Sequence, residues 1–216
     1  MPTKAGAPGP RDERGVLAAR ILREARLAFA ASGWAGTTVR AIARAADVDP
    51  ALIYHYFGSK EGLLDAATTP PPRFLERVAA NWTVPTGELG RHLIQEVMLN
   101  WEDDEIGPTL KAILQTAAHD PTTRDKLRKL IEQGLMGPAQ VGDGDSDRLV
   151  RSSLIASQLL GFGFMRYVWQ IEPIASMSED EILAAMTPNL QRYIDGEIAP
   201  RHHGPQRAAR SPRPEA

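Results

Sequence analysis

The chain has 216 residues, a formal net charge of -2 and no cysteine. The missing thiols exclude disulfides and thiolate metal sites, residues 1–10 lack the apolar core of a signal peptide, and no stretch approaches the roughly 18 apolar residues of a membrane span. We therefore expect a soluble, cytoplasmic protein with no membrane partner.

The charge is distributed unevenly along the chain. Residues 1–64 hold 9 Lys and Arg against 6 Asp and Glu, whereas residues 65–200 hold 12 against 20. A basic segment can face the phosphates of a nucleic acid, and an acidic segment cannot. Any nucleic-acid contact is therefore expected in the first third of the chain.

Residues 1–11 are rich in Gly and Pro, and we expect a disordered leader there. A helix should follow, because apolar residues recur at helical spacing from Leu17 to Phe29. Ser32-Gly33 is a typical helix end, since glycine readily adopts a left-handed conformation. Almost no segment alternates with the period of two that strands show, so the predicted fold class is all-α.

Thr37 and Thr38 precede a segment whose apolar residues share one helical face: Val39, Ile42, Ala43 and Ala46. A threonine hydroxyl can accept a hydrogen bond from a free amide at the start of such a helix. Asp47 follows where the chain must reverse, and aspartate tolerates the left-handed backbone of a tight turn. The sequence thus predicts a short helix and a tight turn.

A third helix should begin at Asp49-Pro50, with aspartate as the N-cap and proline in the first turn. Ile53 and Phe57 lie four residues apart and should face the core. The outer side then carries Ala51, Tyr54, His55 and Tyr56. Two short helices of this kind are typical of a helix-turn-helix that enters the major groove of DNA, although the spacing alone fits a purely structural helical hairpin equally well.

These residues resemble the N-terminal signature of the TetR family of regulators. The similarity covers about residues 14–66, and its most specific part is the run Ile53-Tyr54-His55-Tyr56-Phe57-Gly58-Ser59-Lys60-Glu61-Gly62-Leu63. The resemblance implies a three-helix DNA-binding head over residues 12–66, followed by a helical ligand-binding and dimerisation body. It further implies a homodimeric repressor that binds double-stranded operator DNA and is released by a small hydrophobic effector.

The resemblance also implies two sets of DNA contacts. Contacts to phosphates are expected from Thr38, Tyr54, Tyr56 and Lys60. Contacts to bases, or to bases and phosphates, are expected from Arg40, Pro50, Ala51 and His55. Two positions depart from the family pattern: Asp47 replaces the glycine usual at the turn, and Asp49 stands where serine is common. Asp49 repels phosphate unless it faces a cytosine amino group.

Three consecutive prolines, residues 70–72, forbid a helix and mark the expected boundary before a body over residues 72–198. Helical apolar stripes follow at 93–98, 110–114 and 127–135. Two late helices, about 147–170 and 178–198, hold more apolar and small residues than a surface helix needs, and the resemblance places the dimer interface there. Gly161 and Gly163 should permit close helix packing.

A ligand pocket in this body would have apolar and aromatic walls and a few polar groups. The candidates are Trp82, Met98, Trp101, Ile113, Gln115, His119, Gln158, Phe162 and Met165. Ordinary core packing also explains each of them, and His119 can simply lie at a helix C-terminus. Short runs in this half, such as Arg166-Tyr167-Val168, resemble an actinobacterial subgroup of the family.

The main alternative is a helical-bundle enzyme or small-molecule carrier. The sequence has no Glu-x-x-His pair and no Gly-x-Ser-x-Gly, so we expect no catalytic residue, no cofactor and no metal. The acidic run 102–105 should be solvated rather than bind a metal. The tail 199–216 should be disordered, and its arginines could add nonspecific DNA affinity. An activator with the same DNA-binding head also stays open.

Overall fold

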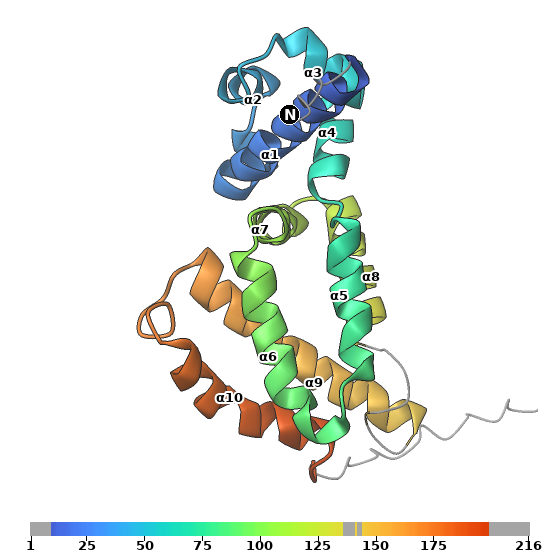
Figure 1. The fold of residues 1–216 in the computed structure, drawn as a ribbon, viewed down its shortest axis with the longest axis vertical. Coiled ribbons are helices and arrows are strands. Elements are labelled where there is room, and N and C mark those ends of the chain that lie inside the picture. The colour runs from blue at the N-terminus through green and yellow to red at the C-terminus, as the bar shows by residue number, and fades with distance from the viewer. Residues whose placement is uncertain (1–9, 136–140, 142–143, 199–216) are drawn as a thin grey trace, which may run out of the picture.

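The computed structural model describes residues 10–135, 141 and 144–198, so most of the predicted leader and the whole predicted tail lie outside the described residues. Within these ranges the chain forms helices and no strand, which confirms the all-α class (Figure 1). The α-helices are α1 (Pro10–Gly36), α2 (Val39–Ala45), α3 (Pro50–Phe57), α4 (Lys60–Ala67), α5 (Pro72–Ala80), α6 (Thr86–Glu102), α7 (Ile106–Ala117), α8 (Pro121–Leu135), α9 (Asp145–Gly163) and α10 (Glu179–Ile194).

The break predicted near Gly33 is confirmed as a kink within α1. Gly33 has φ 61° and ψ -170°, a conformation that glycine adopts without a steric penalty. The Thr37 hydroxyl then donates to the carbonyl of Gly33 at 2.7 Å and to that of Ala28 at 3.1 Å, which ties the end of α1 back onto itself.

The first core lies among α1 to α4. Ile21, Ala25 and Phe29 of α1 are completely buried against the apolar faces of α2, α3 and α4. One member of this core comes from far along the chain: Ala112 of α7 is fully buried with it. The N-terminal head is therefore packed directly on α7, which in Figure 1 lies below α1 and is seen nearly end-on.

The second core lies among α6, α9 and α10, in the lower part of Figure 1. α6 and α10 approach closely at Gly90, whose amide donates to Oε1 of Gln191 at 3.0 Å. A Cβ at this glycine would lie 2.9 Å from the backbone nitrogen of Gln191, so the contact requires the missing side chain.

The prolines break the helix as predicted, because α4 ends at Ala67 and α5 begins at Pro72. The first late helix is shorter as an α-helix than the expected 147–170: it ends at Gly163 and continues as a π-helix over Phe164–Val168. The second, α10, ends at Ile194 rather than 198. None of the described helices is long and apolar enough to span a membrane.

Candidate DNA-binding face and ligand cavity

The turn between α2 and α3 has the geometry that its sequence predicts. Thr38 caps α2 by accepting a hydrogen bond from the amide of Ala41 at 3.1 Å. Asp47 has φ 51°, the left-handed conformation expected of it. Asp49 caps α3 by accepting from the amide of Ala51 at 2.7 Å, with Pro50 in the first turn. Local hydrogen bonds and backbone preferences thus fix the orientation of α3.

The outer face of these two helices is exposed. Ile53 points inward and is completely buried, whereas 52% of Tyr54 is accessible. The other exposed members of the predicted contact set are Thr38, Arg40, Ala51 and His55. Pro50 is half-buried at the start of α3. The exposed sides of α2 and α3 therefore present hydroxyl, guanidinium and imidazole groups to solvent.

Two predicted contact residues are already engaged within the head. Lys60 donates from Nζ to the carbonyl of Trp34 at 2.7 Å and lies 4.0 Å from the centre of the Trp34 ring. Tyr56 is half-buried, packs against the first core and meets the His55 ring edge-on. Any DNA contact from Lys60 would share its ammonium group with the Trp34 carbonyl.

A cavity of about 150 Å³ lies in the body between α5, α6, α7, α8 and α9. Its walls are mostly aliphatic and aromatic. The 16 lining residues are Phe74, Val78, Asn81, Leu93, Glu96, Val97, Asn100, Trp101, Leu110, Ile113, Leu114, Leu127, Leu130, Ile131, Leu159 and Leu160.

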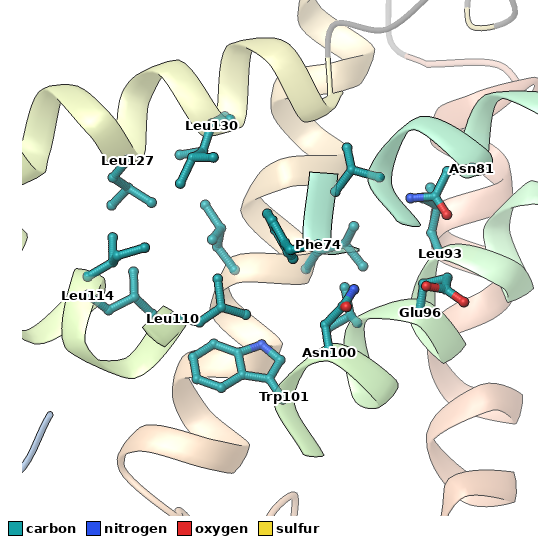
Figure 2. A pocket seen from close by; sticks show the side chains of 16 residues that line it. Phe74, Asn81, Leu93, Glu96, Asn100, Trp101, Leu110, Leu114, Leu127 and Leu130 are labelled. Carbon is teal, nitrogen blue, oxygen red and sulfur yellow. The ribbon is translucent and has the colours of Figure 1, made fainter. Parts of the chain in front are cut away.

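The polar lining groups gather at one side of the cavity. In Figure 2, Asn81, Glu96 and Asn100 lie on one side, whereas Leu110, Leu114, Leu127 and Leu130 lie on the other. The cavity therefore has a polar end on α6 and η1 (the short 3-10 helix Asn81–Thr83) and an apolar end on α7 and α8.

The predicted pocket residues are only partly brought together. Trp101 and Ile113 line the cavity. Met98 and Phe162 are buried in the second core instead, Gln115 and Met165 are half-buried outside the lining, and Gln158 is exposed on α9. His119 is exposed just beyond the C-terminus of α7, which is the alternative position considered for it. The side chain of Trp82 lies outside the described part of the chain.

Most of the lining was absent from the predicted set. Leu110 and Leu114, and likewise Leu127, Leu130 and Ile131, stand out in the sequence as helical stripes, but such a stripe has the same pattern whether it faces a core or a cavity. Glu96 and Asn100 carried no local signal beyond being polar residues on the face of α6 that also holds Leu93.

Trp101 is held by an aromatic stack. Its ring lies parallel to that of Tyr167, with centres 5.4 Å apart, and Gly163 lies directly behind it: a Cβ there would be 2.4 Å from Nε1 of Trp101. Burial, aided by the hydrogen bond to Glu102, raises the pKa of Tyr167 to about 12. Gly163 thus has the close-packing role predicted for it, whereas a Cβ at Gly161 would meet nothing within 4 Å in this chain.

The acidic run before α7 is paired rather than simply solvated. Asp103 accepts from the amides of Glu105 and Ile106, both at 2.9 Å, and so caps α7. Its carboxylate also pairs with Arg73 of α5. Glu105 pairs with Arg73 at 3.2 Å and with Arg26 of the head at 2.9 Å. The expectation of a solvated run was wrong for these two carboxylates, because arginines distant in the sequence face them.

Sequence models of one family match both halves of the chain. The model described as "Bacterial regulatory proteins, tetR family" matches residues 21–67, and the model described as "Tetracyclin repressor-like, C-terminal domain" matches residues 87–194. The first match includes α2, α3 and α4, and the second runs from α6 to the end of α10.

Two curated relatives, both regulators named BetI, match part of the chain in sequence. The chain is 30% identical to the HTH-type transcriptional regulator BetI of Burkholderia thailandensis over 119 residues, which are 50% of this chain and 61% of that protein. It is 32% identical to the BetI regulator of Stenotrophomonas maltophilia over 85 residues, which are 39% of this chain and 43% of that protein. The chain thus spans less than two thirds of the length of either relative.

Solved structures share the overall fold. A TetR-family regulator from Streptomyces coelicolor superimposes with a TM-score of 0.57 at 26% identity, covering 88% of this chain and 99% of that chain. A TetR-like transcriptional regulator from Rhodococcus sp. RHA1 superimposes with a TM-score of 0.58 at 18% identity, covering 88% and 96%.

Proposed function

Because this chain belongs to the TetR family of bacterial transcriptional regulators, we propose that it is a repressor that binds operator DNA as a homodimer and is released by a small-molecule effector. The observation that carries this proposal is the position of α7. Ala112 of this helix is buried in the head core, and the next residue, Ile113, lines the cavity. A molecule that fills the cavity therefore presses on the helix that supports the DNA-binding head.

The DNA contacts would come from the exposed face of α2 and α3. The Tyr54 hydroxyl suits a phosphate oxygen, and Arg40 is long enough to reach a phosphate or a base edge in the major groove. His55 and Ala51 lie on the same outer side of α3 and would meet base edges. In a dimer, two such helices would enter successive major grooves about 34–36 Å apart.

The late helices would form the dimer interface. α9 exposes Leu149, Ser153, Ser157 and Gly161 at intervals of four residues, which places them on one face. α10 exposes a stripe of mostly small residues that includes Ala184, Ala185 and Pro188. Such faces suit close packing of helices from a second copy into a four-helix bundle.

A mobility-shift assay with DNA from upstream of the protein's own gene tests the DNA-binding part. Binding should weaken steeply as salt rises, because phosphate contacts release counterions. A reporter gene under the same promoter separates a repressor, which lowers expression, from an activator. Absence of salt-dependent binding to any upstream fragment would refute the proposal. The narrower assignment to an actinobacterial subgroup stays a prediction.

A further inference from the structure

One end of the cavity is lined by apolar side chains. The wall at the other end contains a polar group that has no hydrogen-bond partner. Two of its three hydrogen-bonding side chains at the polar end have partners: Asn81 Oδ1 lies 3.0 Å from Nε2 of His92, and Asn100 Oδ1 accepts from Arg77 at 3.1 Å. Both amide oxygens are therefore occupied by the protein itself.

Glu96 differs from these neighbours. Its Oε2 atom is buried and has no hydrogen-bond partner among the described residues. It is also the one charged side chain among the sixteen that line the cavity. A buried carboxylate oxygen without a donor is unfavourable, and it becomes favourable when a cation or a strong donor approaches it. Glu96 therefore has capacity for a donor that this chain does not supply.

We propose that the effector is a lipophilic amine, with its ammonium group on Glu96 and its hydrocarbon part among the leucines of α7 and α8. This inference rests on the proposed function and names the ligand class of its cavity. An ammonium supplies both charge and hydrogen-bond donors to the carboxylate. The rings of Trp101 and Phe74, which also line the cavity, can add a cation-π contact.

An anionic head group is disfavoured by the same geometry. At the polar end, Arg77 donates a hydrogen bond to Asn100, and its guanidinium lies 4.0 Å from the Asp103 carboxylate. Its charge is thus already paired outside the cavity. A ligand carboxylate at the polar end would instead lie next to the Glu96 carboxylate, and two negative charges in contact repel each other.

Three probes with the same hydrocarbon chain test the proposal: octylamine, 1-octanol and octanoate. Their binding to the full chain is measured by titration calorimetry and by Trp fluorescence. We expect octylamine to bind at least about tenfold more tightly than 1-octanol, and octanoate to bind most weakly. Glu96→Gln should remove the preference for the amine while leaving the affinity for 1-octanol within about twofold. Glu88→Gln, an exposed position on the same helix, is the matched control and should change nothing.

Several results would overturn the proposal: no octylamine binding, 1-octanol or octanoate binding as tightly as octylamine, or an unchanged preference in Glu96→Gln. The proposed function fails by a different readout, since octylamine that binds in a Glu96-dependent manner without releasing DNA refutes effector release and leaves the ligand class intact.

Discussion

Arg26 of the head donates from Nη1 to Oε1 of Glu105, the residue before α7, at 2.9 Å. Only 7% of the Arg26 side chain is exposed, and its Nε has no hydrogen-bond partner. Glu105 is the carboxylate that pairs with this buried guanidinium among the described residues. Glu105 is joined through Arg73 to Asp103, and Asp103 through Arg77 to Asn100 in the cavity wall. A continuous set of polar contacts thus links the cavity to the head.

Replacing Glu105 with Gln should weaken this link. The variant leaves a buried guanidinium without its carboxylate, and we expect the free energy of unfolding to fall by about 1–3 kcal/mol. Effector-induced release of DNA should also require more ligand. Urea unfolding and a mobility shift with increasing octylamine measure the two effects. Asp104→Asn, at the exposed position next to it, should leave both unchanged, and equal behaviour of the two variants would contradict the role of Glu105.

Low pH should weaken the ion pairs of Asp103 with Arg73 and Arg77, because protonation removes the charge of the Asp103 carboxylate. Burial raises the pKa of this carboxyl, but the amide hydrogen bonds from Ile106 and Glu105 and the charges of Arg73 and Arg77 outweigh that effect, so its pKa lies below the ordinary 3.8. A lowered native pKa means that its contribution to stability is present above the ordinary value and is lost as the pH falls through the native one.

The stability difference between wild type and Asp103→Asn should therefore stay constant above about pH 5 and shrink as the pH falls from about 5 to about 2. Urea unfolding at several pH values measures it. A difference that stays constant over this range would show that Asp103 does not titrate with folding.

Adding one methyl group at Gly163 should disturb the cavity wall. The new Cβ of Gly163→Ala would lie 2.4 Å from Nε1 of Trp101, whose ring is confined by its stack on Tyr167. We expect a loss of about 1–3 kcal/mol and a shifted Trp emission spectrum. Gly87→Ala, at an exposed glycine in the first turn of α6 whose Cβ would meet nothing within 4 Å, should be neutral or more stable by up to about 1 kcal/mol. Equal losses in both variants would contradict the role of the contact with Trp101.

A large charged side chain at Gly161 should separate the dimer without unfolding the protomer. Gly161 is exposed in the single chain, so Gly161→Arg meets no obstacle there, yet it would place a charge within the proposed interface. Sedimentation velocity should show a monomer with an unchanged helical circular dichroism spectrum. Ala79→Arg on α5 serves as the control, and a dimeric Gly161→Arg protein would exclude this face of α9 from the interface.

Two substitutions on the head should have different effects on the affinity and sequence preference of DNA binding. Tyr54→Phe removes a phosphate donor and should weaken binding to all sequences alike, whereas Arg40→Ala should also relax base preference and lower the salt slope by about one. Titration of operator and mismatched DNA at several salt concentrations separates these effects. Arg91→Ala, exposed on α6 in the body, should match wild type. A Tyr54→Phe protein with unchanged affinity would refute the phosphate contact.

The caps and the turn of the helix-turn-helix could be predicted residue by residue because their geometry is local. The caps from Thr38 and Asp49 and the left-handed Asp47 depend on neighbours within three residues. The cavity could not be predicted in this way, since Leu110 or Leu127 in a stripe gives no sign of whether a ligand or another side chain faces it. The pairing of Arg26 with Glu105 joins positions 79 residues apart, and only the packing of α1 on α7 brings them together.

The position of Ala112 also limits how the chain can be recombined. The three prolines at residues 70–72, where α5 begins, suggest a boundary at which this head could be fused to another body, but the head core is incomplete without a residue from α7. A functional chimaera would have to keep α7, or an alanine-sized residue at the equivalent place, together with a carboxylate for Arg26. The unit that can be exchanged between regulators of this kind is then the head with its supporting helix, and the part of the cavity wall that α7 supplies is transferred with it.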